Sequence, residues 1–282
     1  MTEHLDAILC LVHNGDARAR LALRQLEKLA CIGANLDAKI IQFSFQPVIV
    51  PHSKRHAWRR TLIYRRLAEE WSRYRNLPRP KKRLREKLSF YRRALKSWRR
   101  ERDTVTAWQR RSAIEVNVTD KHIRAWYSFL ETGADFILVM EDDAVFEVDT
   151  LLLFKDVLQF VRERVVEDKP LYIDLAGGCS LQDLEIDFLR GEKVLNRFRI
   201  YKRPVTNTAC CYLLSRSLVE NFVATLIDHP EYRLIGIDWM MNQLFIDLWA
   251  KNVVVDCVHA EPPIIRHGSV TGDFISWQQH YK

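Results

Sequence analysis

Short apolar runs alternate with amphipathic stretches through the first part of the chain. The first run covers Leu5 to Val12, and Asn14-Gly15-Asp16 forms a turn before a stretch from Ala17 to Cys31 whose leucines recur at helical spacing. A second β-rich run follows from Ala38 to Phe45. This pattern predicts a β-α-β opening, which is typical of nucleotide-binding halves, although the glycine-rich fingerprint of dinucleotide-binding folds is absent. A classical dehydrogenase is therefore not expected.

A later apolar run ends in three consecutive carboxylates. Phe136 to Met140 form an uninterrupted β-rich run, which predicts a strand covered on both faces in a parallel or mixed α/β sheet. Glu141, Asp142 and Asp143 follow at its C-terminal end, the edge where open α/β sheets bind ligands. Clustered carboxylates repel one another unless a cation is present, and hard oxygen ligands suit Mg²⁺ or Mn²⁺ bound together with a substrate diphosphate. An acidic surface turn would explain the same triplet.

The second half continues the alternation of helices and strands. A capping signal at Val118-Thr119-Asp120 predicts a helix from Lys121 to Thr132, and Ser215 is placed to cap another. Together these patterns predict an α/β fold. The remaining predicted elements are a helix from Thr150 to about Glu167, strands at Leu171 to Leu175, Thr206 to Ser215 and Val253 to Val258, helices at Arg216 to Asp228 and Trp239 to Ala250, and a C-terminal loop containing His259, Glu261, His267 and Ser269.

Composition favours one large α/β domain, since 282 residues with 48% hydrophobic content can bury a sizeable core. The six cysteines show no CxxC pair or metal-ligand spacing, so we expect reduced core residues. The N-terminus lacks the basic leader of a signal peptide, and no apolar run reaches transmembrane length. We expect a cytoplasmic protein, either soluble or peripheral on the inner face of the membrane.

Positive charge is concentrated in Lys54 to Arg111. This segment holds 22 Lys and Arg against 5 Asp and Glu, a net charge of +17, which leaves −9 on the remaining chain. Pro78-Arg79-Pro80 divides it into two predicted helices with apolar stripes flanked by arginines, as in helices that lie on an anionic membrane. A solvated hairpin whose stripes pack on each other explains the pattern equally well. No recognised motif supports nucleic-acid binding, which is not expected.

The ordered motifs resemble glycosyltransferase family 25, which contains lipooligosaccharide galactosyltransferases and procollagen galactosyltransferases. The resemblance covers most of the chain except Lys54 to Arg111, and Asp120-Lys121 departs from the family's usual residues before His122. The matching pieces are the helix with Asp16, Arg18 and Arg20, the His122 to Trp126 segment, the acidic strand from Asp135 to Phe146, the stretch from Thr208 to Arg216, and the late aspartate motif from Ile237 to Asn242.

This resemblance implies a single GT-A-like domain over residues 1–282, with a mixed central sheet and residues 54–111 as a basic helical insertion. It also implies an inverting transfer that uses a divalent metal, Mn²⁺ or Mg²⁺, and a nucleotide-sugar donor. The donor is commonly a UDP-hexose such as UDP-galactose. The acceptor would be a glycan or glycolipid, such as lipopolysaccharide or lipooligosaccharide, and the basic insertion would meet an anionic membrane surface. The sequence leaves the sugar, the acceptor and the linkage open.

The resemblance also suggests roles for individual residues. Asp238 is expected to be the general base, although a helix N-cap would explain it as well. His267 is expected to complete the metal site, against the alternative of a surface loop histidine. Two other function classes stay open: a catalytically inactive nucleotide-binding scaffold, and a nucleic-acid-binding protein acting through the basic hairpin. The predicted metal ligands are Glu141, Asp143 and His267, and the predicted donor-binding residues are Asp142, Asn207 and Thr208. Binding of the acceptor, or capping at the entry to a strand, would explain Asn207 and Thr208 as well.

Overall fold

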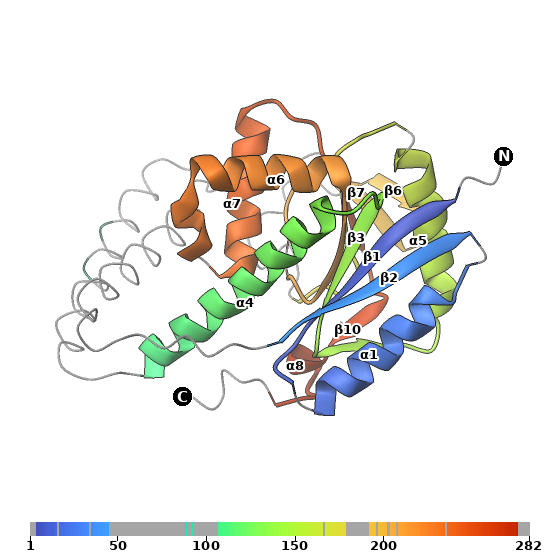
Figure 1. Ribbon diagram of the computed structural model, residues 1–282, viewed down its shortest axis with the longest axis horizontal. Coiled ribbons are helices and arrows are strands. Elements are labelled where there is room, and N and C mark those ends of the chain that lie inside the picture. The colour runs from blue at the N-terminus through green and yellow to red at the C-terminus, as the bar shows by residue number, and fades with distance from the viewer. Residues whose placement is uncertain are drawn as a thin grey trace.

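The computed structural model is an α/β protein built around a mixed sheet, and helices cover both faces of that sheet (Figure 1). The structure describes residues 4–15, 17–33, 35–44, 107–165, 167–178, 192–195, 197–201, 204–206, 208–234 and 236–275, together with positions 88 and 92. Within these residues the main sheet has eight strands and a smaller sheet has two. The predicted fold class, α/β with a mixed central sheet, is confirmed.

The main sheet changes strand direction along its width. Its strands, in spatial order, are β2 (Leu36–Phe43), β1 (Leu5–Val12), β3 (Phe136–Glu141), β8 (Cys211–Ser215), β5 (Leu171–Asp174), β9 (Asp256–Ala260), β7 (Phe198–Tyr201) and β6 (Glu192–Leu195). Strand β1 runs parallel to both β2 and β3, whereas β8 is antiparallel to both β3 and β5. The smaller sheet pairs β4 (Ala144–Phe146) with β10 (Ile265–His267).

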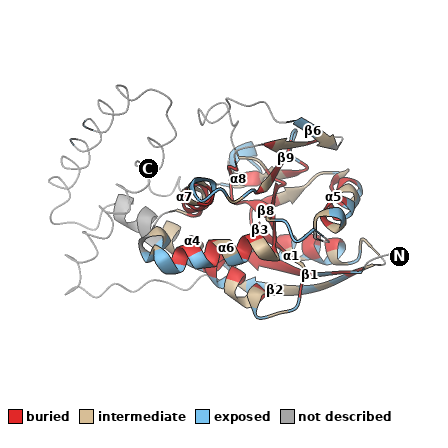
Figure 2. Ribbon diagram, turned by 90° about the horizontal axis from the view of Figure 1, so that it is seen from above, coloured by how far each residue is buried: buried red, intermediate tan, exposed pale blue. Residues whose placement is uncertain are grey.

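Two helix layers bury the sheet between them. Helices α1 (Ala17–Ala30) and α5 (Thr150–Val165) pack on one face, and α4 (Ala107–Leu130), α6 (Arg216–Asp228) and α7 (Ile237–Ala250) pack on the other. Successive side chains of β3 alternate between these layers, because Leu138 joins the first core and Ile137 and Val139 join the second. Figure 2 shows the largely buried strands between the helices. This double burial explains why the run is apolar without alternation.

The chain leaves β1 and enters β3 on opposite faces of the sheet. Helix α1 connects β1 to β2 on one face, and α4 covers the other face before β3 begins. Two parallel strands related in this way form a topological switch point, and a crevice opens outside their C-terminal ends. His13 and Asn14 follow β1 at this edge, and Glu141 ends β3. The acidic triplet therefore lies where this architecture binds ligands.

Several predicted boundaries match the structure closely. Strand β1 has the predicted bounds, and Ser215 caps α6 by accepting a hydrogen bond from the backbone N–H of Leu218. Strand β3 extends the predicted run by one residue, to Glu141. The second strand is shifted toward the N-terminus and spans Leu36–Phe43.

The prediction for the helix before β3 was wrong at its start. Helix α4 begins at Ala107, so the expected capping signal lies inside the helix. The Thr119 hydroxyl donates to the carbonyl of Glu115, one turn earlier, a bond that Thr forms within helices and not as an N-cap. The predicted end of the basic hairpin at Arg111 lies within α4 as well. Apart from positions 88, 92 and 107–111, Lys54 to Arg111 lies outside the described residues.

The C-terminal part contains more regular structure than predicted. The segment expected to be a loop forms the end of β9, strand β10 and the short helix α8 (Gly268–Thr271). Strand β8 begins at Cys211, five residues later than the predicted strand at Thr206. Helix α7 begins at Ile237 with Gly236 as its N-cap, which excludes Asp238 from that role. Within the described residues, no helix has both the length and the apolar character needed to cross a membrane.

Candidate functional site

Glu141 points toward helix α4 and pairs with His122. Oε1 of Glu141 lies 3.1 Å from Nε2 of His122, whose imidazole is fully buried. The other ring nitrogen, Nδ1, lies 2.8 Å from the hydroxyl of Tyr212, and that hydroxyl also accepts the indole N–H of Trp126 at 3.2 Å. The Tyr212 hydroxyl thus bonds both the Trp126 indole and the His122 ring, and the second ring nitrogen of His122 bonds Glu141. This row of hydrogen bonds joins the sheet to α4.

The groups in this row favour their neutral forms. Burial lowers the pKa of His122 to about 3. Burial and the negative charge of Asp143 raise the pKa of Glu141 to about 8. A neutral imidazole between a phenol and a carboxyl group holds Glu141 in place without placing a cation beside it.

Asp142 and Lys121 hold the loop that follows β1. Oδ2 of Asp142 accepts the backbone N–H of Asn14 at 3.0 Å. Nζ of Lys121 donates to the carbonyl of His13 at 2.8 Å and to Oδ1 of Asn14 at 3.0 Å. The two side chains therefore fix the backbone that follows β1 beside the C-terminal end of β3, and Lys121 supplies positive charge there. Burial lowers the pKa of this lysine, against the raising effect of Glu141 and Asp142.

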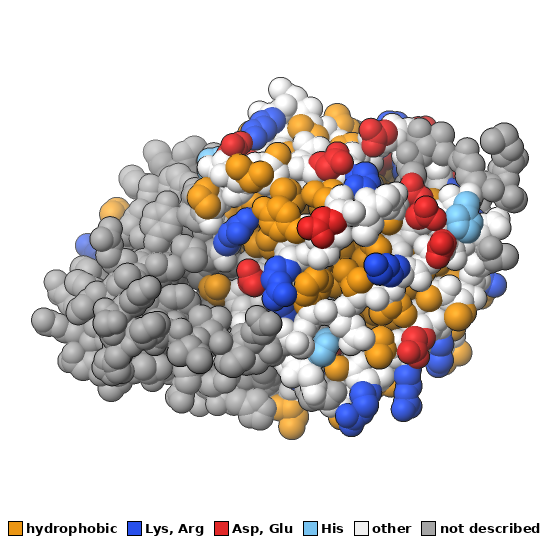
Figure 3. All heavy atoms as spheres, viewed as in Figure 1, with side chains coloured by type: hydrophobic (Ala, Val, Ile, Leu, Met, Phe, Trp, Pro, Cys, Tyr) orange, Lys and Arg blue, Asp and Glu red, His pale blue; other side chains and the backbone are white. Residues whose placement is uncertain are grey.

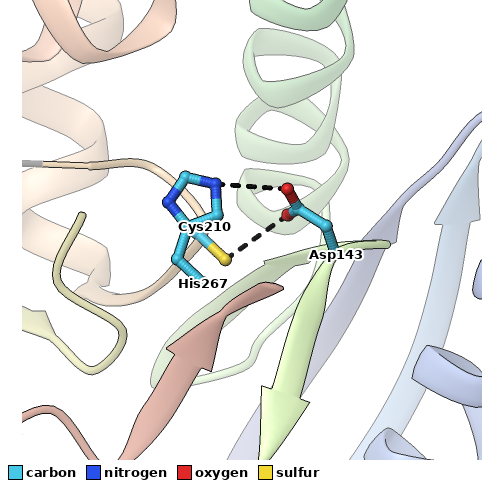
Figure 4. Close-up of side chains that lie close together, drawn as sticks. All are labelled: Asp143, Cys210 and His267. Atoms are coloured by element: carbon cyan, nitrogen blue, oxygen red, sulfur yellow. Dashed lines mark hydrogen bonds and ion pairs between the residues drawn. The ribbon is translucent and has the colours of Figure 1, made fainter. Parts of the chain in front are cut away.

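Asp143 lies in a compact group with Cys210 and His267 (Figure 4). Oδ2 of Asp143 is 3.1 Å from Nε2 of His267, and the Cys210 thiol donates to Oδ1 of Asp143 at 3.5 Å. One potential ligand atom from each residue lies within 4.8 Å of the others. The three residues come from the turn between β3 and β4, the residue before β8, and the end of β10. A buried Asp-Cys-His group of this kind could hold a metal ion.

Further hydrogen bonds hold the Asp143 side chain. The Ser269 hydroxyl donates to Oδ2 of Asp143 at 2.5 Å, and the backbone N–H of Gly268 donates to the Asp143 carbonyl at 2.8 Å. Burial by itself raises the pKa of Asp143. The hydrogen bond and charge of His267 lower it, as do the hydrogen bonds from Ser269 and Cys210, and together they leave the pKa below its usual value. Burial by itself lowers the pKa of His267, but the hydrogen bond and negative charge of Asp143 have the larger effect, so the pKa of His267 is raised. Asp143 and His267 therefore form an ion pair.

Thr208 and Gly178 support the far side of this group. Oγ1 of Thr208 lies 3.5 Å from Nδ1 of His267 and accepts the backbone N–H of Cys210 at 3.3 Å. A Cβ atom at Gly178 would lie 2.9 Å from Cβ of Thr208 and 3.3 Å from Nδ1 of His267. A glycine is required there because a larger residue would collide with the site. Asp174 holds the same loop by accepting the backbone N–H of Gly177 at 3.0 Å.

Asp238 lies in the first turn of α7, within electrostatic reach of the group. Its carboxylate accepts the backbone N–H of Ala209, which ties α7 to the segment leading into β8. Burial and the nearby Glu141 raise the pKa of Asp238 to about 6, against the lowering effects of Ala209, His267 and His122. A carboxyl group with this pKa can accept a proton near neutral pH.

No protein-family model matches this chain, and no curated protein matches it. The arrangement itself supports two kinds of chemistry: coordination of a cation by Asp143, Cys210 and His267, and proton acceptance by Asp238. Asp143 follows the C-terminal end of β3, and Asp238 lies within electrostatic range of Glu141 and His267.

The structure brings some predicted site residues together and separates others. Asp143 and His267 are in contact, and Thr208 lies beside them. Glu141 faces His122 outside the Asp-Cys-His group, and its role as a metal ligand stays a prediction. Asn207 lies outside the described residues.

Sequence reasoning missed Cys210 and Lys121. Cys210 was expected to be a simple core residue; it is buried, but its thiol lies against Asp143. Neither residue belongs to a spacing pattern that signals a ligand. Their only sequence signals are a polar stretch before Cys210 and a lysine next to His122 on a mostly apolar helix face.

Proposed function

We propose that the protein is a metal-dependent inverting glycosyltransferase of the family 25 type, with a GT-A-like arrangement of its sheet. It would move a hexose, in the simplest case galactose from UDP-galactose, onto a glycan or glycolipid acceptor such as lipopolysaccharide or lipooligosaccharide. The observation that carries the proposal is the contact between Asp143 and His267, with Cys210, at the C-terminal end of β3. This edge is where open α/β sheets bind nucleotides.

The crevice between β1 and β3 suits a nucleoside diphosphate. Lys121 Nζ and the backbone around Asn14 lie at the C-terminal end of β1, and Asp143 follows the C-terminal end of β3. A diphosphate beside Glu141, Asp142 and Asp143 needs a bridging cation to offset the repulsion between like charges. With such a cation bound, acidic residues at this edge are compatible with an anionic donor.

Asp143, Cys210 and His267 fit such a cation, because a carboxylate, a thiol and an imidazole converge with short separations. A bound divalent ion would supply positive charge to the diphosphate that leaves when the sugar is transferred. Ser269 and Thr208 hold the side chains of the group in position.

Asp238 is the proposed general base. In the transfer, the acceptor oxygen forms a bond to the anomeric carbon as the bond from that carbon to the diphosphate oxygen breaks. The proton of the acceptor hydroxyl passes to the Asp238 carboxylate. The pKa of about 6 makes Asp238 mostly unprotonated at neutral pH while it remains a better base than an ordinary aspartate.

The basic segment from Lys54 to Arg111 is proposed to hold the enzyme beside its acceptor. Its charge of +17 would attract an anionic membrane surface, where a glycolipid acceptor is embedded. This part of the proposal rests on the sequence.

Calorimetry with nucleotide sugars tests the proposal directly. UDP-hexoses are titrated into the full chain with Mn²⁺, Mg²⁺ or Zn²⁺ supplied in turn, and release of UDP is then measured with candidate acceptors. Asp143→Asn should weaken donor binding at least about tenfold, because the cation that bridges to the diphosphate loses a carboxylate ligand. Asp149→Asn, which removes a surface carboxylate paired with Arg197, is the matched control and should bind normally.

Unchanged donor affinity in Asp143→Asn would contradict the metal and diphosphate assignment. Donor binding without any hydrolysis or transfer would instead favour the catalytically inactive scaffold. Absence of binding by every nucleotide sugar would overturn the proposal as a whole.

A further inference from the structure

The geometry of Asp143, Cys210 and His267 points to a site for a borderline metal ion of the Zn²⁺ or Co²⁺ type, with the Cys210 thiolate as a ligand. We infer that this site prefers such an ion over Mg²⁺. The inference rests on the proposed function because it uses the same three residues, but it makes a claim about metal binding alone. It departs from the expectation, based on the acidic triplet, of an oxygen-only Mg²⁺ or Mn²⁺ site.

The separations between the ligand atoms are close to those of a tetrahedral centre. Zinc bonds of about 2.3 Å to sulfur and about 2.0–2.2 Å to nitrogen and oxygen place ligand atoms roughly 3.2–3.7 Å apart at tetrahedral angles. Sγ of Cys210 is 3.5 Å from Oδ1 of Asp143, and Nε2 of His267 is 3.1 Å from Oδ2. The ligand atoms of Cys210 and His267 lie within 4.8 Å of each other, so these two side chains have to move closer together to share one ion.

The ligand types favour the same metals. Mg²⁺ requires oxygen ligands in near-octahedral geometry and usually keeps several waters. A buried thiol and an imidazole provide no oxygen ligands. Thiolate and imidazole together suit Zn²⁺ and its spectroscopic substitute Co²⁺. Three protein ligands leave a fourth position for water or a substrate oxygen, as in catalytic zinc sites.

Neighbouring groups are placed as outer-shell partners of metal ligands usually are. Metal-bound histidines commonly donate their second ring N–H to an oxygen, and Oγ1 of Thr208 lies 3.5 Å from Nδ1 of His267. The Ser269 hydroxyl donates to the Asp143 carboxylate and holds it in place. Because Gly178 has no side chain, it does not push the His267 imidazole away from the site.

Metal binding would exchange protons for the ion. The Cys210 thiol is buried and donates its proton to Oδ1 of Asp143, and Nε2 of His267 carries the proton of its ion pair with Asp143. A metal ion held by both side chains would replace the S–H bond and the Nε2–H bond, and both protons would leave to solvent, so two protons are released for each ion bound. A Cys210 that served only as a core residue would bind no metal and release no proton.

Cobalt absorption spectroscopy on the full chain tests the inference without donor or turnover. Titration with Co²⁺ should produce a thiolate-to-cobalt charge-transfer band in the near ultraviolet and the visible bands of tetrahedral cobalt, with one ion per chain. Zn²⁺ should displace the cobalt, and excess Mg²⁺ should not. Cys210→Ser should lose the charge-transfer band and bind Co²⁺ on the order of a hundredfold more weakly. His267→Gln should weaken binding but keep the charge-transfer band at high cobalt concentration.

Cys31→Ser and Cys179→Ser are the controls and should keep the full spectrum. Cys31 is an exposed thiol, and Cys179 follows Gly178 in sequence outside the described residues. Circular dichroism verifies that Cys210→Ser is folded; if it is not, Cys210→Ala replaces it, and the His267→Gln spectrum provides a second criterion. An unchanged spectrum in a folded Cys210 variant, or no charge-transfer band in the natural chain, overturns the inference.

The outcomes also separate this inference from the proposed function. If the protein binds cobalt through Cys210 but binds no nucleotide sugar, the metal site is supported and the proposed glycosyltransferase function is contradicted. If donor binding depends on Mn²⁺ and cobalt gives no charge-transfer band, the proposed function is supported and the Cys210 metal site is contradicted.

Discussion

The hydroxyl of Tyr212 lies 2.8 Å from Nδ1 of His122, and this contact joins strand β8 to helix α4. The same hydroxyl accepts the indole N–H of Trp126, so one oxygen serves two fully buried side chains. The other nitrogen of the His122 ring lies 3.1 Å from Oε1 of Glu141 at the edge of the candidate site. The position of Glu141 therefore depends on a phenol in the core.

Tyr212→Phe should lower the free energy of unfolding by about 2 kcal/mol, because it leaves a buried imidazole nitrogen and a buried indole N–H without a partner. Urea denaturation measures this change. Tyr127→Phe is the matched control, since its hydroxyl accepts a bond from the exposed Arg233 that water can replace; we expect a change within about 0.5 kcal/mol. Equal stability of the two variants would show that the Tyr212 hydroxyl holds nothing in place.

Arg216 joins the start of α6 to the end of α4. Its guanidinium donates to the carbonyl of Thr132 at 2.6 Å and to that of Ala134 at 2.8 and 3.0 Å, and it lies over the Phe129 ring. Arg216→Met should keep most of the packing but lose these bonds, and we expect a loss of about 1–2 kcal/mol in the free energy of unfolding. Arg233→Met, on an exposed arginine, should change it by less than about 0.5 kcal/mol. The prediction fails if thermal and urea unfolding cannot distinguish the two variants.

The proposed base gives a pH dependence of defined sign. Asp238 works only when unprotonated, and its pKa is raised to about 6, so kcat/KM should be maximal above that value and fall as pH drops below it. Asp238→Asn should remove this dependence and lower the transfer rate on the order of a hundredfold or more while donor binding persists. Asp247→Asn, on the same helix, serves as the control and should retain both the rate and the pH profile. Near-normal turnover in Asp238→Asn would remove it as the base.

The basic segment should bind anionic membranes in a salt-sensitive manner. Each basic residue near an anionic surface contributes about 1 kcal/mol, so engagement of a minority of the 22 would suffice for attachment. Liposome co-sedimentation should show pelleting with anionic vesicles and none with neutral ones. A variant lacking Lys54 to Thr104 should stay in the supernatant; this deletion stops short of α4, which begins at Ala107. If the folded natural chain fails to pellet at low salt, the membrane account is excluded and a self-packed hairpin is favoured.

Local signals in the sequence determined the elements that depend on neighbouring residues. The apolar run from Leu5 to Val12 became β1 with those bounds, and the serine before Arg216 became the cap of α6. Both features follow from short-range physics, because side-chain alternation and capping hydrogen bonds act within a few residues. The acidic end of β3 was visible for the same reason, as was its position at a ligand-binding edge.

Only the tertiary structure decided which side chains meet there. Strand β8 pairs with β3 in a register that sets Cys211 beside Met140, and the backbone N–H of Glu141 bonds to the carbonyl of Cys210. This antiparallel pairing brings Cys210 to Asp143, and β10, paired with β4, brings His267 and then Ser269 to the same carboxylate. Strand neighbours depend on the packing of helices far along the chain, and no local pattern encodes them. The sequence by itself therefore determined the acidic end of β3, whereas the order of the strands determined which ligands surround it.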